Sequence, residues 1–211
     1  MPDILLNHLY TGNLQKTDSY WLDLQKLLDA GTRKRIQKNR NRRQQINSLC
    51  SKLMLYHMAN DCIGKVSPSS HPLRYSTKGY PSLMGIPLSI SISYQGDWVT
   101  VAISHNVRIG IDVESVERNV KFKQIPLNWR RKLERINIKT WNELEAYAKL
   151  WGHGLSILFS KPLPYDSSIS FTHLPVSYNI DCCVASAGVT NIKQYYVQWD
   201  DIAYSFKNAI D

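Results

Sequence analysis

The chain has 211 residues and a formal net charge of +9, and 43% of its residues are hydrophobic and 20% charged. This composition excludes an intrinsically disordered chain, and the length suits one large domain or two small ones. No apolar run approaches the roughly 20 residues of a membrane span, so we expect no membrane partner. The first residues lack a signal-peptide pattern and the four cysteines lack metal-ligand spacing. We therefore expect a cytoplasmic protein with reduced thiols.

Helical patterns dominate the first third of the chain. Apolar residues recur at helical spacing over 21–28, and residues 30–31 (Ala-Gly) are expected to end this helix. A second helix is predicted to start in the basic segment described below and to continue as an amphipathic helix over 46–64. Residues 67–87 contain four of the nine prolines, so loops with at most one short strand are expected there.

The positive charge is concentrated in one segment, residues 33–43, which has seven basic side chains and no acidic one. Without those seven, 19 of the 26 basic residues remain against 17 acidic ones, so the rest of the chain is nearly neutral. A cluster this dense indicates an anion site for a phosphate-rich ligand, a nucleic acid or an acidic protein. A solvated helix face is the alternative, although such faces usually mix Lys with Glu.

Strand patterns begin at residues 88–93, where apolar side chains alternate with serines as in a half-buried strand. Short turns lead to further predicted strands at 98–103 and 109–114, and three strands joined in this way predict a meander. Helical character at 128–135 precedes a clear predicted helix at 140–151. Later strands are predicted at 168–171, 181–185 and 195–199. The chain is therefore predicted to be α+β, with a division near residues 104–108.

Two carboxylates are predicted to project from one face of a strand. Asp112 and Glu114 lie two residues apart, so their side chains point the same way. Paired hard oxygen ligands suit Mg²⁺, although such a pair is also common on an exposed strand edge. On the following helix, Glu145 and Lys149 are spaced i,i+4. They form either an ordinary ion pair, worth about 0.3–0.5 kcal/mol, or a third metal ligand or base beside a lysine that neutralises phosphate charge.

Four segments follow one another in an order that a known family shares. Ile109–Glu114 is similar to the pattern G-[IV]-D-[IV]-E, and Trp141–Gly154 is similar to W-x-x-K-E-[AS]-x-x-K-x-x-G-x-G. Ile90–Val99 resembles a strand-turn-strand of the pattern F-N-[IL]-S-H-S-G-x-[WY]. The basic segment leading into Ser48–Leu55 resembles an N-terminal helix with phosphate-binding residues. Together these segments, over about residues 33–155, resemble the Sfp-type 4′-phosphopantetheinyl transferases.

The resemblance implies a fold and an activity. The fold is an α+β pair of similar halves, residues 1–105 and 106–211, related by a pseudo-two-fold axis with the active site in the cleft between them. The activity is Mg²⁺-dependent transfer of the 4′-phosphopantetheine arm of coenzyme A to a serine of an apo acyl, peptidyl or aryl carrier protein, with release of 3′,5′-adenosine bisphosphate. A family member that holds both halves in one chain is expected to be a monomer.

The resemblance also implies roles for particular residues. Asp112, Glu114 and Glu145 would hold Mg²⁺, Glu145 would accept the serine proton, and Lys149 would offset phosphate charge. The residues expected to bind coenzyme A, mainly through its phosphates, are Arg33, Arg35, Lys38, Arg43, Lys78, Ser93 and Tyr94.

Four positions depart from the family pattern. Tyr94 stands where the family has histidine, Asn47 where it has arginine, and Tyr80 and Leu144 where it has lysine. One interpretation is a working transferase with substituted phosphate-binding groups. Another is the same fold with impaired catalysis, acting as a coenzyme A or carrier-protein binder. A nucleic-acid binder acting through residues 33–43 is the interpretation from a different class, and no nucleic-acid-binding motif supports it.

Overall fold

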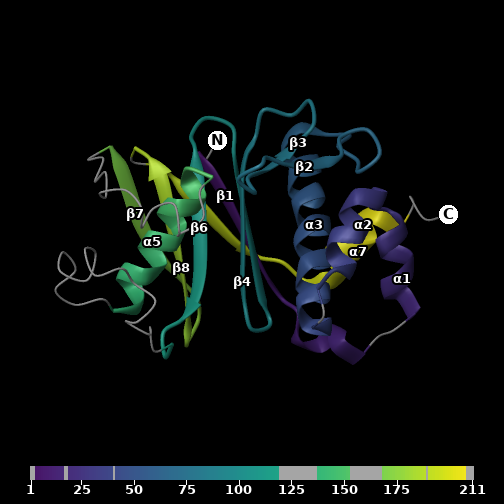
Figure 1. Cartoon of the computed structure of the whole chain (residues 1–211), viewed down its shortest axis with the longest axis horizontal. Coiled ribbons are helices and arrows are strands. Elements are labelled where there is room, and N and C mark those ends of the chain that lie inside the picture. The colour runs from purple at the N-terminus through teal and green to yellow at the C-terminus, as the bar shows by residue number, and fades with distance from the viewer. Residues whose placement is uncertain are drawn as a thin grey trace.

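A computed structural model describes residues 3–16, 19–39, 41–118, 137–152, 168–188 and 190–207, which form a mixed α+β fold (Figure 1). Up to residue 104 the elements are β1 (Ile4–Tyr10), a 3-10 helix (Gly12–Lys16), α1 (Ser19–Lys26), α2 (Ala30–Gln37), α3 (Arg42–Ile63), β2 (Leu73–Tyr75), β3 (Pro81–Leu83), β4 (Ser89–Gln95) and β5 (Trp98–Ser104). The later elements are β6 (Ile109–Ser115), α5 (Ile138–Leu150), β7 (Ile169–Ser177), β8 (Ile180–Ala187), β9 (Ile192–Tyr196) and α7 (Trp199–Lys207). No helix in these described ranges is long and apolar enough to cross a membrane.

The first layer is helical and is centred on α3. Asn41 caps this helix by accepting a hydrogen bond from the backbone N–H of Arg43 (2.8 Å), and Gly64 ends it with a φ of 77°. Nearly every side chain between Ile46 and Ala59 is buried, so α3 is covered on most sides. Helices α1, α2 and α7 lie beside it at one end of the molecule (Figure 1).

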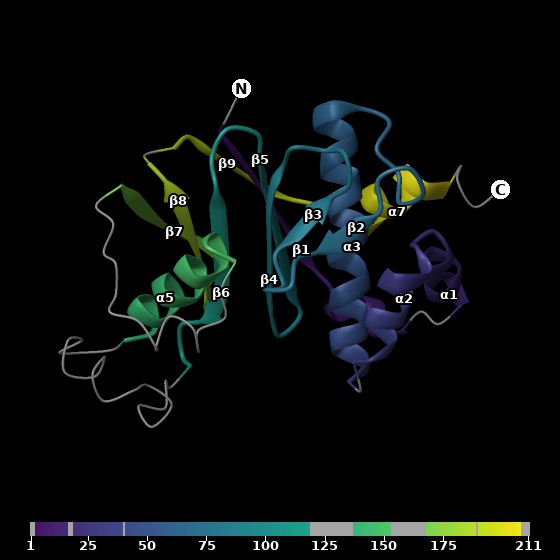
Figure 2. The same cartoon turned by 45° about the horizontal axis from the view of Figure 1, so that its top comes forward.

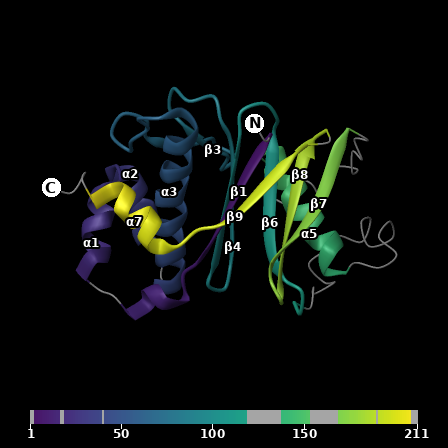
Figure 3. The ribbon, with the colours of Figure 1, turned by 180° about the vertical axis from the view of Figure 1, so that it is seen from behind.

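The second layer is a four-stranded sheet with the order β4-β5-β1-β9. β4 and β5 form an antiparallel hairpin, β1 is antiparallel to β5, and β9 is parallel to β1. Val99, Val101 and Ile103 of β5 face the core that α3 shares with this sheet. The C-terminal β9 and α7, which the predicted division assigns to the second half, return to β1 and α3 (Figure 3).

The third layer is an antiparallel sheet with the order β6-β8-β7, and α5 packs on it as a fourth layer (Figure 2). Helix and strand approach closely at Gly110 of β6, where an added β-carbon would meet the backbone of α5. Cys182 and Cys183 are neighbours on β8 and face opposite sides, the first toward the other sheet and the second toward α5. This alternation is the one that strand geometry requires.

The two sheets pack face to face, and serine side chains join them where β4 lies beside β6. Ser91 and Ser93 are buried in this seam, with 3% and 5% of their surface exposed. The serine hydroxyls of β4 accept hydrogen bonds from backbone N–H groups of β6, from Ile109 to Ser89 (3.0 Å), Ile111 to Ser91 (2.9 Å) and Val113 to Ser93 (3.2 Å). The alternating serines therefore connect two sheets rather than face solvent.

Removing one of these hydroxyls should weaken the seam. We expect Ser91→Ala to lower the free energy of unfolding by about 1–2 kcal/mol, because the buried N–H of Ile111 loses its acceptor. Urea unfolding followed by tryptophan fluorescence would measure the change. The control is Ser82→Ala on the exposed face of β3, which should shift stability by less than about 0.5 kcal/mol. Equal effects of the two substitutions would contradict the bridging role.

The strands predicted at 88–93, 98–103 and 109–114 and the helix at 140–151 are confirmed as β4, β5, β6 and α5. The predicted meander is wrong in its third strand, because β6 pairs with β8, and toward β4 its backbone N–H groups bond to serine hydroxyls instead of forming a backbone ladder. Residues 30–31 begin α2 instead of ending α1, since the Asp29 side chain accepts from the backbone N–H of Thr32 and caps a new helix. The helical character predicted at 128–135 lies outside the described residues.

Candidate functional site

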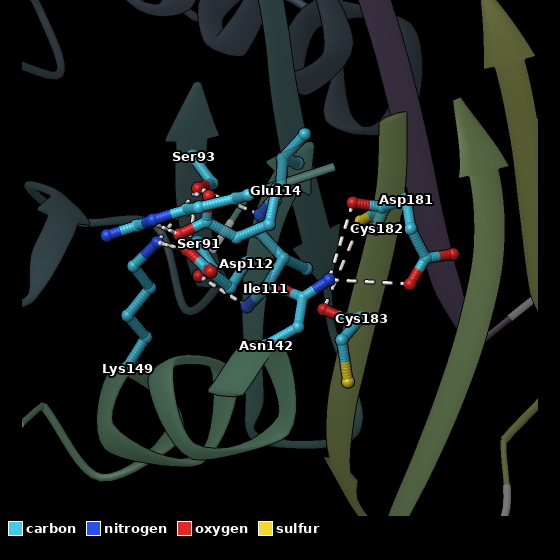
Figure 4. Close-up of polar contacts among 12 residues, drawn as sticks. Ser91, Ser93, Ile111, Asp112, Glu114, Asn142, Lys149, Asp181, Cys182 and Cys183 are labelled. Atoms are coloured by element: carbon cyan, nitrogen blue, oxygen red, sulfur yellow. Dashed lines mark hydrogen bonds and ion pairs between the residues drawn. The ribbon is translucent and has the colours of Figure 1, made fainter. Parts of the chain in front are cut away.

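Asp112 is at the centre of a buried polar cluster in the seam between the sheets (Figure 4). Its Oδ1 atom accepts hydrogen bonds from Lys149 Nζ (2.7 Å) and Ser93 Oγ (3.0 Å), and Lys149 Nζ also donates to Ser93 Oγ (2.9 Å). Only 7% of the Asp112 side chain is exposed, so the ammonium compensates a charge that water barely reaches. The cluster thus ties α5 to β6 and β4.

Asn142 contacts the same carboxylate from α5. With its amide nitrogen toward the strand, Asn142 donates to the backbone oxygen of Asp112 (2.9 Å) and to its Oδ2 atom (3.1 Å). The side chain lies between Asp112 and Asp181 of β8 (Figure 4). Both carboxylate oxygens of Asp112 therefore have polar partners. The sequence analysis did not identify Asn142 as a site residue. The only indication in the sequence is that a polar residue stands on the face of the helix that is otherwise apolar and buried.

Glu114 is the second buried carboxylate, on the same face of β6 as Asp112. Its Oε1 atom pairs with the guanidinium of Arg118, which also lies 5.6 Å from the centroid of the Trp141 ring. Its Oε2 atom is buried and has no hydrogen-bond partner among the described residues. One oxygen of Glu114 is therefore buried without a polar partner in the described part of the chain.

Glu145 is half-buried on α5, one turn before Lys149. Burial, and then the negative charge of Asp112, raise the pKa of Glu145 above its ordinary value, while Lys149 and Arg118 oppose that shift. A raised pKa makes a carboxylate a stronger proton acceptor near neutral pH. Lys149, the predicted partner of Glu145, donates instead to Asp112, so its ammonium bonds to the more buried acid on β6.

The acidic side chains fit a hard divalent cation in their chemistry. Asp112, Glu114 and Glu145 offer only oxygen atoms, which Mg²⁺ prefers, and Glu114 Oε2 lacks a partner. In the ranges that the structure describes, no group of three or more His, Cys, Asp or Glu side chains is already arranged to hold a metal ion. Lys149 pairs with Oδ1 of Asp112 and Arg118 with Oε1 of Glu114, so a metal ion that used either of these two atoms would have to displace a cation.

A pocket of about 330 Å³ opens beside this cluster, between α2 and α3 on one side and the end of α5 on the other. β4 lines its base. Among the described residues, four basic side chains and three tyrosines line the pocket and no acidic side chain does. These residues are Arg35, Lys52, Lys78, Lys149, Tyr75, Tyr80 and Tyr94. Cations and aromatic rings together suit a ligand with phosphate groups and a planar ring.

The basic segment, residues 33–43, contributes fewer side chains to this pocket than the sequence analysis predicted. Arg35 lines the pocket, whereas Arg43 pairs with Asp97 (2.7 Å) outside it. Arg33 donates to a backbone carbonyl of α1 (3.2 Å), and Lys38 is exposed at the end of α2. Of the four residues predicted from this segment, the structure therefore brings Arg35 to the candidate site and leaves the other three elsewhere.

The remaining predicted ligand-binding residues divide between the pocket and the cluster. Lys78 and Tyr94 line the pocket. Ser93 points into the Asp112 cluster, on the opposite face of β4 from Tyr94, because successive side chains of a strand point to opposite faces.

Positions that depart from the family pattern have structural roles. Asn47 is buried, accepts a hydrogen bond from Thr11 (2.7 Å) and donates to a backbone carbonyl of the β4–β5 turn (2.9 Å). Tyr80 lines the pocket, with its hydroxyl 2.7 Å from that of Ser89. Leu144 is a buried residue of α5, in the hydrophobic core that this helix shares with β8. The pocket therefore has a tyrosine where the family pattern has a lysine.

Lys52 is the pocket residue that sequence reasoning missed. It lies on α3 within a run of buried side chains and is itself 6% exposed. A lysine inside an otherwise buried stretch of helix was the available signal, because lysine is almost never fully buried without a partner.

The chain was also compared with known proteins. A scan against protein-family models gave no match, and a search of curated proteins gave none.

Proposed function

We propose that the protein transfers the 4′-phosphopantetheine arm of coenzyme A to a serine of an apo acyl, peptidyl or aryl carrier protein. The supporting observation is the position of the Asp112–Ser93–Lys149 cluster at the rim of a pocket that is lined by cations. A diphosphate ester needs both a positively charged pocket and acidic side chains at the reacting phosphorus. The motif resemblance supports the same reaction.

Each residue of the site has a role in the proposed reaction. Asp112, Glu114 and Glu145 would hold Mg²⁺, whose chemistry when bound is neutralisation of the diphosphate charge. Glu145 takes the proton as the serine oxygen forms its bond to the β-phosphorus, and the bond from that phosphorus to 3′,5′-adenosine bisphosphate breaks. Lys149 balances charge on the phosphates, and the pocket side chains bind the nucleotide end.

The proposal also concerns the architecture. The α5–β6 unit and the α3–β4–β5 unit would be the two similar halves of a pseudo-two-fold pair, with the pocket between them. A cytoplasmic monomer remains the prediction for the working protein.

Transfer of a fluorescent coenzyme A conjugate to a panel of apo carrier proteins in the presence of Mg²⁺ tests the proposal. We expect Glu145→Gln to lower labelling by about 10²- to 10⁴-fold, because the proton acceptor is lost. The matched control is Glu143→Gln, the same change on the same helix, at a residue that faces His173 (3.1 Å) outside the site. Equal labelling by the two variants would remove Glu145 from the mechanism.

A second candidate function is favoured by one observation, the cations that already occupy Asp112 and Glu114. In that case the protein binds coenzyme A or a carrier protein without catalysis. Calorimetric binding of coenzyme A with no labelling of any carrier protein would favour this function over transfer.

A further inference from the structure

The amide group of Asn142 lies between two acidic residues, Asp112 of β6 and Asp181 of β8 (Figure 4). Asn142 is 1% exposed, so its amide is shielded from water. On one side the amide lies 2.9 Å from the backbone oxygen of Asp112 and 3.1 Å from its Oδ2 atom. On the other side the backbone oxygen and Oδ2 of Asp181 are both 3.4 Å away. An amide has one NH2 group and one carbonyl oxygen, so it can donate to only one of these two acids.

Asp181 has another donor, which leaves the NH2 group of Asn142 for Asp112. The Nδ1 atom of His173 lies 2.6 Å from Oδ2 of Asp181. The two donors already described at Asp112 bond to its other oxygen, Oδ1. Within the described residues, Oδ2 of Asp112 therefore depends on Asn142 for its hydrogen bond. Since a buried carboxylate oxygen without a donor is costly, the shorter contacts at Asp112 are the ones in which the amide donates.

The two carboxylate oxygens of Asp112 differ in how easily their partners can be replaced. The partner of Oδ1 is Lys149, whose side chain is 31% exposed and lines the pocket. A ligand that arrives from the pocket can take the place of this ammonium when the flexible lysine side chain moves. The partner of Oδ2 is a short, buried side chain that α5 holds in place. Oδ1 is therefore the exchangeable oxygen of Asp112.

We propose that Asn142 is a positioning residue for Asp112, which holds Oδ2 and the backbone oxygen and so presents Oδ1 to a divalent cation. The inference deepens the proposed function, on which it rests, because it names the residue that orients one of the three acids expected to hold Mg²⁺. Asn142 acts only through Asp112 and takes no part in the bond that breaks. Groups that hydrogen-bond to a metal-ligating carboxylate fix its orientation, and their removal typically lowers metal affinity by about 10- to 100-fold.

Titration of the full chain with Mn²⁺ alone, followed by electron paramagnetic resonance, tests the inference without any transfer step. We expect Asn142→Ala to weaken Mn²⁺ binding by about 10- to 100-fold. Asn142→Ser, whose hydroxyl is too short to replace both contacts but leaves room for water, should also weaken binding and is the variant to use if the alanine variant does not fold. Asp112→Asn identifies the site, because Mn²⁺ bound at Asp112 should be lost in that variant.

Asn47→Ala is the matched control for stability. It removes another buried amide that donates to a backbone carbonyl (2.9 Å), on α3 instead of α5. Both alanine variants should lower the melting temperature, because each leaves a buried polar group unpaired. Asn47→Ala should nevertheless bind Mn²⁺ like the native chain. A loss of Mn²⁺ affinity in Asn142→Ala alone is therefore not a consequence of lower stability.

The outcomes separate this inference from the proposed transfer reaction, because Mn²⁺ binding and carrier labelling are measured independently. Weaker Mn²⁺ binding that is confined to the Asn142 variants supports the inference even if no carrier protein is labelled. Native Mn²⁺ affinity in a folded Asn142 variant overturns it, even if transfer is found. No Mn²⁺ binding by the native chain, or binding that Asp112→Asn leaves unchanged, overturns it as well, whatever the labelling shows.

Discussion

Gly110→Ala is expected to destabilise the protein by about 3 kcal/mol or more, because the new methyl group has no space. A β-carbon on Gly110 would lie 2.1 Å from the carbonyl oxygen of Ala146 and 2.3 Å from the backbone nitrogen of Leu150. Both are backbone atoms of α5, so no side-chain rotation relieves the overlap and the helix must move away from β6. Chemical unfolding followed by circular dichroism would measure the loss.

The same substitution at Gly31 is the matched control. This glycine lies in the first turn of α2 and is exposed, and a β-carbon there comes no closer than 3.1 Å to the Asp29 side chain. Alanine favours helices over glycine, so Gly31→Ala should change stability by less than about 1 kcal/mol. Native stability in Gly110→Ala would contradict the close packing of α5 on β6. Loss of carrier labelling is also expected from Gly110→Ala, since α5 holds Glu145 and Lys149.

Local patterns predicted the elements of the fold better than their pairing. Strand β4 was predictable because serines alternate with Leu and Ile, and α5 because its apolar residues recur at helical spacing. The same alternation does not reveal the strand partner. β6 follows β5 after a short turn and yet pairs with β8, because β5 already has β4 on one edge and β1 on the other.

The part of the candidate site that lies on β6 could be predicted, because the two-residue period of a strand determines which side chains share a face. Asp112 and Glu114 share a face of β6 as their spacing requires. The partner of Lys149 was not predictable, because the helix offers Glu145 at i,i+4 while Asp112 approaches only after β6 and α5 pack together. The position of Lys52 in the pocket could not be predicted for a related reason. The pocket that contains Lys52 forms only when α2 and the β2–β3 hairpin pack around α3.

Replacement of Lys149 is expected to lower both the stability of the protein and carrier labelling, because this residue contributes to the fold and to the proposed chemistry. Lys149→Met leaves the buried Asp112 carboxylate without its cation, and we expect a loss of about 2–4 kcal/mol in unfolding free energy, discounted because the Lys149 side chain is 31% exposed. Carrier labelling should fall by about 10²- to 10³-fold, as when a charge-stabilising donor is removed. Lys139→Met, at an exposed position on the same helix, should change neither quantity.

A second substitution separates the two roles of Lys149. In the double variant Asp112→Asn/Lys149→Met the buried charge is removed together with its partner, so at least about 1 kcal/mol of the lost stability should return. Labelling should stay at the level of Lys149→Met or below, because neither the acid nor the cation is restored. Recovery of stability without recovery of labelling would show that the ion pair serves the fold while its members serve the reaction. Recovery of both would mean that neither side chain takes part in the reaction and that Lys149 serves only to compensate the buried charge of Asp112.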